Sequence, residues 1–319
     1  MRVGAGTTPL LAEHAAILHG SDAALVHAAT PFLDDGLRAG DLVLLACSAE
    51  RARQLCEPLG EQARGIDTDS RIALVGTRGP DAFGALRSRL RRAAEGPRRV
   101  RLVEQLDHPR VPGGAREAVR YDLATNAILA GAAVSVLCLI DTRRLPADLL
   151  DLAVAGHPQL VVDGALTANP RVGDPAALVR ALTPPGTPVE HLPSLLSVDR
   201  ATALAPLRGR LRSALAGMVP AGDQQEDLVL AVSEIAANAF RHGRPPVSAR
   251  LWGNDRELVC TITDSGRGYS DPLAGFVPAH GDDLGRGGMG LWLARKLWDS
   301  VDLLPGEHGL TVRLGTRIG

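Results

Sequence analysis

The sequence predicts two domains of different classes, an α/β domain with a mostly parallel sheet followed by an α+β domain. Three observations support this. The chain has 319 residues, enough for about two domains of ~150 residues each. Short apolar runs alternate with helix-like segments through its first half. Residues 183–193 then contain four prolines, and the pattern changes after them.

The first part of the chain alternates between two kinds of hydrophobic pattern. Helix-like segments lie at 23–38, 49–59, 81–94, 116–129 and 145–154, and strand-like runs lie at 41–47, 71–75, 100–105, 134–140 and 159–163. Continuous apolar runs are typical of strands that are buried on both faces. Their alternation with helices predicts a parallel sheet covered on both sides. We expect this domain to span residues 8–182.

The proline-rich stretch marks the boundary. Proline restricts its own backbone and that of the preceding residue, so we interpret residues 183–197 as a semi-rigid linker. Helix-like segments follow at 201–216, 226–241 and 289–298, and strand-like runs follow at 247–252, 257–263, 300–304 and 310–314. This order predicts an α+β sandwich over residues 198–319.

Composition argues against several functions. The net charge of −1 provides no general attraction to nucleic acid or anionic lipid, and the 3% aromatic content does not favour base stacking. No signal peptide and no membrane-length apolar run is visible, so we expect a cytoplasmic protein. Its cysteines, Cys47, Cys56, Cys138 and Cys260, have no CxxC spacing and are expected to be free thiols.

A polar stripe stands out on the helix expected at 226–241. Glu234, Asn238 and His242 are spaced four residues apart and therefore share one helical face. Carboxylate and carboxamide oxygens are ligands that Mg²⁺ accepts, so the stripe suits a divalent metal and phosphates. Considered alone, the stripe is more typical of a solvated helix face.

Two glycine-containing motifs follow in order. The first begins at Asp264, where a strand-like run ends, and continues through Gly266 to Gly268; its carboxylate can accept a hydrogen bond from an amine. The second, residues 285–290, is a glycine-rich loop that leads into a helix, an arrangement that presents free N–H groups to an anion. Either motif alone is weak evidence, but the ordered set of three indicates a nucleotide site.

These motifs resemble the N-box, G1 box and G2 box of the GHKL ATPases. The compact form is most similar to the bacterial anti-sigma factor serine kinases. The resemblance implies ATP and Mg²⁺ as cofactors. It makes Asn238 the Mg²⁺ ligand, Asp264 the partner of the adenine amine, and Glu234 the general base that activates a protein serine.

The resemblance implies further ATP contacts. Gly266 and Gly268 would line the adenine pocket, Gly288, Met289 and Gly290 would hold the phosphates, and His242 would complete the polar stripe. Arg286, in the expected lid at residues 270–287, would reach the γ-phosphate, and Thr311 would lie near the base. These assignments rest on the family pattern alone.

The surroundings of the ATPase motifs separate three hypotheses. A histidine kinase needs a phosphoacceptor histidine on a helical hairpin, whereas His191 lies among prolines. The favoured hypothesis is a switch that binds a sigma factor and phosphorylates a serine or threonine of an anti-anti-sigma protein. It involves no direct nucleic-acid or membrane partner, and it leaves homodimerisation open. A sensor that binds ATP without catalysis is the third hypothesis.

The first domain resembles the MEDS sensory domain. The matching residues are His14, the segment 32–40, the segment 138–142 and the segment 156–158. Residues 36–40 are also similar to RecA-like clock ATPases, which implies a RecA-like fold. Those enzymes hold phosphate with a P-loop lysine, but this chain has no lysine before Lys296, so we expect no nucleotide hydrolysis here.

Several side chains of the first domain are candidates for sensing, each with a structural alternative. Ends of strands carry Cys47, Ser48, Glu104 and Asp141, where ligands of open α/β sheets usually bind. His14 and His157 could bind a metal or small molecule, although a lone histidine is more often a hydrogen-bonded structural residue. The arginines Arg91, Arg92, Arg98, Arg99 and Arg101 could attract an acidic partner or form a solvated surface.

Overall fold

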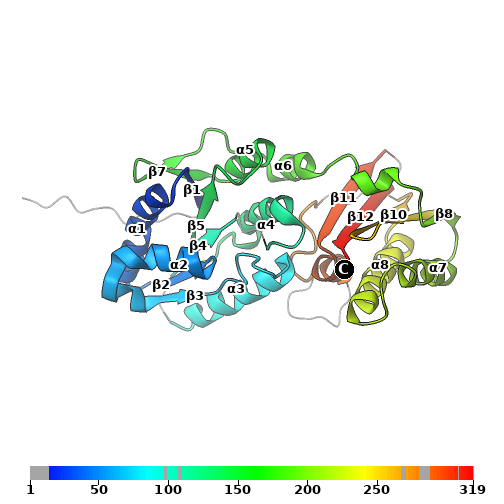
Figure 1. Cartoon of the computed structure of the whole chain (residues 1–319), viewed down its shortest axis with the longest axis horizontal. Coiled ribbons are helices and arrows are strands. Elements are labelled where there is room, and N and C mark those ends of the chain that lie inside the picture. Colours follow the sequence, from blue (N-terminus) through cyan, green and yellow to red (C-terminus); the bar gives the residue numbers. More distant parts are fainter. Residues whose placement is uncertain are drawn as a thin grey trace, which may run out of the picture. The chain divides into compact units, whose positions relative to one another are not determined.

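The computed structural model describes residues 14–96, 99–106, 110–266, 271–279, 288–307 and 309–318 (Figure 1). The chain divides into two compact units. The first contains the residues up to Thr77 and Asp81–Leu178, and the second contains Arg78–Pro80 and the chain from Val179 onward. No helix in the described part of the chain has the length and apolar character needed to span a membrane.

The first unit is built on a seven-stranded sheet with the order β3-β2-β4-β5-β1-β6-β7. Its strands are β1 (His14–His19), β2 (Leu42–Ala46), β3 (Ile66–Thr68), β4 (Val100–Gln105), β5 (Val134–Asp141), β6 (Gln159–Val162) and β7 (Ala165–Ala168). All neighbouring pairs are parallel except β6 and β7. The predicted mostly parallel α/β sheet is therefore confirmed.

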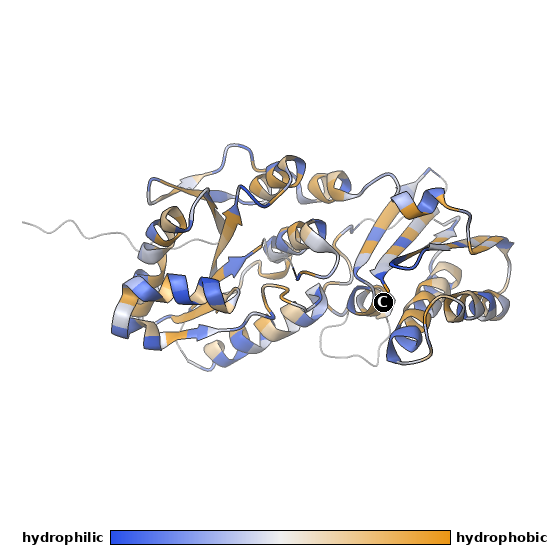
Figure 2. Ribbon diagram, in the orientation of Figure 1, coloured by the Kyte–Doolittle hydropathy of each residue, from blue (hydrophilic) through white to orange (hydrophobic). Residues whose placement is uncertain are grey.

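Helices cover this sheet on both sides. They are α1 (Asp22–Ala39), α2 (Ala49–Cys56), α3 (Gly79–Ala94), α4 (Gly114–Ile128), α5 (Ala147–Ala155) and α6 (Pro175–Leu182). The odd-numbered side chains of β1, β2, β4 and β5 pack with α1 and α2. Because side chains alternate along a strand, the even-numbered ones face the opposite side. Figure 2 shows that the helices carry both hydrophilic and hydrophobic residues, as expected for covering helices.

One predicted strand is wrong. Residues 71–75 form turns, and Leu74 has a φ of 59°. The carboxylate of Asp69 accepts hydrogen bonds from the backbone N–H of Arg71 at 3.2 Å and from its guanidinium at 2.8 and 2.9 Å. Such local side-chain bonds compete with strand pairing. The run is apolar because Ile72, Ala73 and Leu74 are buried inside these turns.

The second unit contains a five-stranded antiparallel sheet with the order β11-β12-β10-β9-β8. Its strands are β8 (Leu196–Ala201), β9 (Val247–Gly253), β10 (Glu257–Asp264), β11 (Ser300–Gly306) and β12 (Gly309–Arg317). The helices α7 (Leu204–Ala216), α8 (Asp223–Arg241) and α9 (Gly290–Leu297) form a common apolar core with the sheet. This arrangement confirms the predicted antiparallel α+β class.

The predicted linker has more structure than its prolines suggested. Residues 183–197 include a short 3₁₀ helix, Pro188–His191, and their last two residues begin the edge strand β8. The buried Arg313 of β12 holds this segment: it donates to Asp302 at 2.8 and 3.0 Å, to the carbonyl of Pro184, and to Glu190 at 3.4 Å. The segment is therefore fastened to the second sheet.

Candidate functional site

A partly enclosed cavity of about 130 Å³ lies in the second unit among α8, α9, β10 and β12. Its walls are mostly apolar, and its polar side chains are those of Asn238, His242 and Asp264. The remaining lining residues are Ile235, Ala239, Gly243, Ile262, Leu291, Leu310 and Val312. Three polar side chains from two predicted motifs, Asn238 on α8, His242 at its C-terminal cap and Asp264 at the end of β10, are thus brought together around one space.

Asp264 provides the carboxylate of this cavity and is 8% exposed. Its Oδ1 accepts a hydrogen bond from the backbone N–H of Gly266 at 2.7 Å. A Cβ atom at Gly243 would come within 2.3 Å of the Asp264 carboxyl carbon, so glycine is required for this close approach. Burial raises the pKa of the Asp264 carboxyl, and backbone hydrogen bonds from Gly266 and Arg244 oppose that rise.

Asn238 lies against the beginning of α9. A Cβ atom at Gly290 would be 2.3 Å from Asn238 Nδ2, so a side chain at that position would displace the carboxamide. Gly288 adopts the left-handed conformation with a φ of 75°, and Met289 is the N-cap residue. The first turn of a helix has N–H groups without intrahelical partners, so the α9 terminus beside Asn238 can receive an anion.

His242 ends α8 at the mouth of the cavity. It is exposed, and its backbone N–H donates to the Asn238 carbonyl at 2.8 Å. This bond keeps the last turn of α8 helical, so the Asn238 and His242 side chains remain on the side of the helix that faces the cavity.

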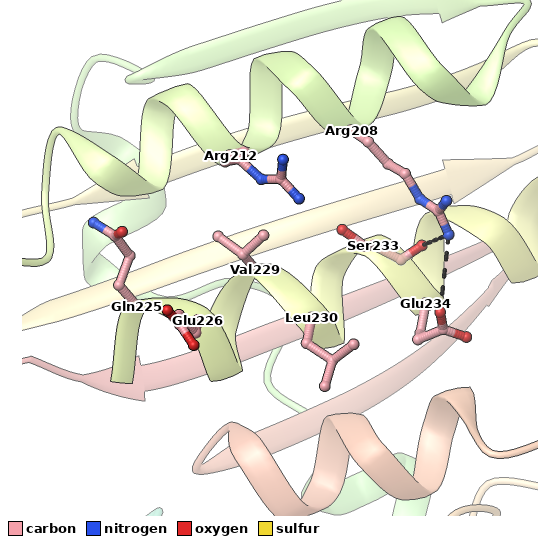
Figure 3. Close-up of a pocket in the computed structure, with 8 residues that line it drawn as sticks. All are labelled: Arg208, Arg212, Gln225, Glu226, Val229, Leu230, Ser233 and Glu234. Carbon is pink, nitrogen blue, oxygen red and sulfur yellow. Dashed lines mark hydrogen bonds and ion pairs between the residues drawn. The ribbon is translucent and has the colours of Figure 1, made fainter. Parts of the chain in front are cut away.

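Glu234 does not line this cavity. Its carboxylate lies in a neighbouring groove between α7 and α8, where Arg208 Nη2 approaches it to 3.8 Å (Figure 3). Both side chains are roughly one-third exposed, at 39% for Arg208 and 35% for Glu234. Arg208 also donates to the carbonyl of Ser233 at 3.3 Å. The structure therefore places Glu234 one helical turn from Asn238 with a cationic partner.

Thr311 faces away from the cavity. Its hydroxyl lies 2.8 Å from that of Thr263, its partner in the register of β10 and β12. Leu310 and Val312, the residues on either side of it, line the cavity instead. Gly268 and Arg286 lie outside the described residues, as do residues 270 and 280–287 of the expected lid, so their predicted roles have no structural counterpart here.

The structure adds the apolar walls that the motifs did not reveal. Ile262 on β10 and Val312 on β12 are paired in register, and both line the cavity. Leu291 contributes from the first turn of α9. Alternation along the two strands was the available signal, but it also describes any strand with one buried face.

Most predicted candidates of the first unit have structural partners. Ser48 caps α2 by accepting from the N–H of Arg51 at 3.3 Å, and Asp141 binds Arg143 at 2.6 and 2.8 Å. Burial raises the pKa of the Cys47 thiol to about 12. Glu104 is buried, with no hydrogen-bond partner for its carboxyl oxygens among the described residues.

The arginine cluster is not one surface. Arg101 is buried, donates to Asp41 at 2.7 Å and to the carbonyl of Phe32 at 3.0 Å, and stacks over the Phe32 ring. Arg98 lies outside the described residues. The interpretation of these arginines as a single solvated or partner-binding group is therefore wrong for Arg101, which is a core residue.

Two family descriptions match different parts of the chain. Residues 198–316 match the histidine kinase-like ATPase domain, and residues 13–158 match MEDS, the methanogen/methylotroph, DcmR sensory domain. The chain is also 32% identical over 103 residues to the serine-protein kinase RsbW of Bacillus velezensis and to that of Bacillus subtilis. Each alignment covers 29% of this chain and 64% of the relative.

Proposed function

We propose that this chain, which joins a MEDS sensory domain to an ATP-binding histidine kinase-like ATPase domain, is a regulator of the anti-sigma serine kinase type. The observation that carries the proposal is the cavity in which Asp264, Asn238 and the start of α9 come together. The likeness to the RsbW kinases supports the same class. In this proposal the MEDS domain, about residues 8–182, is the input and residues 198–319 form the output.

The cavity fits the base of ATP. Apolar side chains such as Ile262, Leu291 and Val312 provide walls for a flat ring, and Asp264 is the carboxylate among them. We assign the exocyclic amine of adenine to Asp264, since a buried carboxylate needs a donor to replace water. Gly266 lines the same end, because its N–H binds Asp264. Gly268 and Thr311 are proposed only from the family pattern.

The α9 terminus fits the phosphates. We propose that the backbone around Gly288, Met289 and Gly290 receives them, because their charge is favoured at a helix start. Asn238 lies against that start and would supply a carboxamide oxygen to Mg²⁺, with His242 beside it. The ion would offset the phosphate charge there. Arg286 remains the proposed γ-phosphate contact.

Glu234 is the proposed general base. It would accept the proton of a partner serine hydroxyl while the serine oxygen bonds to the γ-phosphorus and the bond to the β-phosphate oxygen breaks. The guanidinium of Arg208 lies 3.8 Å from this carboxylate, at the edge of the same groove. The partner side is therefore the α7–α8 groove of Figure 3, where an incoming hydroxyl could reach Glu234. We propose a sigma factor and an anti-anti-sigma protein as the partners.

Co-purification from the native host, with and without ATP, tests this proposal, with phosphosite mapping of the recovered proteins. We expect a sigma factor in one nucleotide state and acid-stable phosphoserine or phosphothreonine on a second partner. Acid-labile phosphate on His191 or another histidine of this chain would overturn the serine kinase assignment. If neither partner is recovered in any nucleotide state, the anti-sigma assignment is overturned.

A non-catalytic ATP-binding switch is the second candidate. The observation that favours it is the ion pair of Glu234 with Arg208 outside the cavity. The variant Glu234→Gln distinguishes the two functions. A kinase loses phosphoryl transfer by ~100-fold or more when its base is removed, whereas a switch keeps nucleotide-dependent partner binding and has no transfer activity to lose.

A further inference from the structure

Four side chains that are distant in sequence meet inside the first unit. His14 begins β1, Cys138 lies in the adjacent strand β5, Asp122 projects from α4, and His157 follows α5 (Figure 1). All four are buried, and their potential ligand atoms lie within 4.8 Å of one another. In the parallel pairing of β1 and β5, Ala16 lies opposite Cys138. His14 lies two positions before Ala16, so the side chains of His14 and Cys138 are on the same face of the sheet.

Four of the six distances between the ligand atoms match those of a tetrahedral site. Asp122 Oδ1 lies 3.2 Å from His14 Nε2 and 3.4 Å from His157 Nε2. Cys138 Sγ lies 3.3 Å from His14 Nε2 and 3.4 Å from Asp122 Oδ1. Zinc bonds of ~2.0 Å to nitrogen or oxygen and ~2.3 Å to sulfur place tetrahedral ligands about 3.3–3.6 Å apart. The remaining two distances, both from His157, lie within 4.8 Å, so His157 is the ligand that would move closer on binding.

Both imidazoles are oriented by their other nitrogen. His157 Nδ1 lies 2.8 Å from the carbonyl of Ala153, which can only accept, so this nitrogen carries the proton. His14 Nδ1 lies 2.8 Å from Asn126 Oδ1, and the Asn126 amide donates to the carbonyl of Gly156 at 2.8 Å. In its neutral form, each ring directs the lone pair of Nε2 into the cluster. Outer hydrogen bonds of this kind orient histidines that bind metals.

Without a bound ion, some buried polar atoms of the cluster lack hydrogen-bond partners. His157 Nε2 and Asp122 Oδ2 are buried and have no hydrogen-bond partner among the described residues. Two imidazole lone pairs and a carboxylate facing one another repel unless a proton or a cation lies among them. The environment therefore favours a positive charge beside Asp122.

We propose that His14, Asp122, Cys138 and His157 form a binding site for a divalent transition-metal ion, with Zn²⁺ as its preferred occupant. A thiolate, a carboxylate and two neutral imidazoles carry a net charge of −2, which a divalent ion neutralises without other counterions. Mixed sulfur, nitrogen and oxygen ligands in a four-coordinate shell suit Zn²⁺ and its spectroscopic substitute Co²⁺. The bound ion would tie two strands to α4 and to the turn after α5.

Co²⁺ titration of the reduced, chelator-treated full chain tests the proposal. We expect a single ion per chain, visible bands of four-coordinate Co²⁺, and a near-ultraviolet thiolate-to-cobalt charge-transfer band that Zn²⁺ abolishes. Folded wild-type protein that develops no charge-transfer band would overturn the proposal. This readout needs no variant, so it does not depend on any substitution being tolerated.

Variants locate the ion. Cys138→Ser should remove the charge-transfer band, and His157→Gln should weaken the affinity for Co²⁺. Asn126→Leu leaves the four ligands in place but removes an orienting bond, so it should weaken affinity ~10- to 100-fold. Cys47→Ser, which changes another buried thiol of this unit, and His27→Gln, at an exposed position, are the controls and should bind as wild type. A band that survives Cys138→Ser but is lost in Cys47→Ser would place the metal elsewhere and overturn the assignment.

Discussion

The carboxylates of Asp122 and Asp264 are both buried, yet their pKa values are displaced in opposite directions. Asp122 is fully buried, but two imidazoles hold its pKa low despite the burial. At Asp264 burial prevails and the pKa is raised, since backbone hydrogen bonds oppose it only in part. A carboxylate with imidazole neighbours suits a cation, whereas one among apolar walls and backbone amides suits a neutral donor such as an adenine amine.

The largest effect should come from Asp122→Asn. This substitution keeps the size of the side chain but removes the negative charge that faces two buried imidazoles, and breaking a buried ion pair costs about 3–5 kcal/mol of unfolding free energy. Hydrogen–deuterium exchange of peptides from β5 and α4 measures the loss within the first unit. Asp151→Asn, on the exposed side of α5, is the control. Unchanged exchange in Asp122→Asn would mean that the charge is not coupled to the imidazoles.

Asp264→Asn should have the next largest effect, on binding rather than on stability. Loss of a hydrogen bond to a charged group costs about 1.5–3 kcal/mol, so we expect ATP affinity to fall ~10- to 150-fold. Unfolding should change little, because the raised pKa means that burial already disfavours the ionised form. The raised pKa also means that Asp264 becomes protonated at a higher pH than an ordinary aspartate. On acidification, the ATP affinity of the wild type should therefore begin to fall at that higher pH.

Calorimetric titration with ATP measures both effects, and Asp255→Asn, in the exposed turn between β9 and β10, is the matched control. Equal affinity in Asp264→Asn and wild type would remove Asp264 from the adenine site while leaving the cavity itself in place.

The two carboxylates also differ in how visible they were in the sequence. Asp264 belongs to a short motif in which strand end, acid and glycines are contiguous, so local chemistry indicated it. Asp122 lies within a helix-like segment that carries no motif, and only the parallel pairing of β1 with β5 brings His14 and Cys138 to it. His14 and His157 could be suspected singly, but the sequence could not join them, because their proximity depends on long-range packing.

The same distinction explains the errors in the fold. Periodicity located the long helices and the apolar strands, since each has a strong local pattern. It missed β1, β3, β7 and β8, and three of these, β3, β7 and β8, lie at sheet edges. Residues 196–201 include Asp199 and Arg200 and read as loop, but pairing with β9 makes them a strand. Tertiary pairing overrides a weak local preference in such segments.

Glu104→Leu should have a moderate, stabilising effect. Burial raises the pKa of the Glu104 carboxyl, and the nearby Asp122 charge raises it further. Above the ordinary glutamate pKa, the unfolded chain ionises while the folded chain keeps its proton. The folded state then binds more protons, so stability falls as pH rises until the folded pKa is passed. Leucine removes this titration and two unpaired oxygens, which should gain about 1–3 kcal/mol at neutral pH.

Urea unfolding of chelator-treated protein between pH 5 and pH 8 measures how the free energy of unfolding changes with pH. This range lies above the ordinary glutamate pKa of ~4.3. Glu104→Gln is the control: it also removes the titration but leaves a buried polar group, so it should flatten the slope without the full gain. A leucine variant that keeps the wild-type slope would show that another group titrates in this range.

The smallest effect should come from Arg208→Met in the α7–α8 groove. The pair with Glu234 is partly exposed and 3.8 Å apart, so it contributes less than about 1 kcal/mol to stability. Removing the guanidinium frees the proposed base from a competing partner, which should raise the rate of phosphoryl transfer by at most about fivefold, the equivalent of that energy. Arg212→Met, on the same helix and in the same groove, is the control. A loss of transfer in Arg208→Met alone would mean instead that Arg208 holds Glu234 in its working position, and the proposed competition would be wrong.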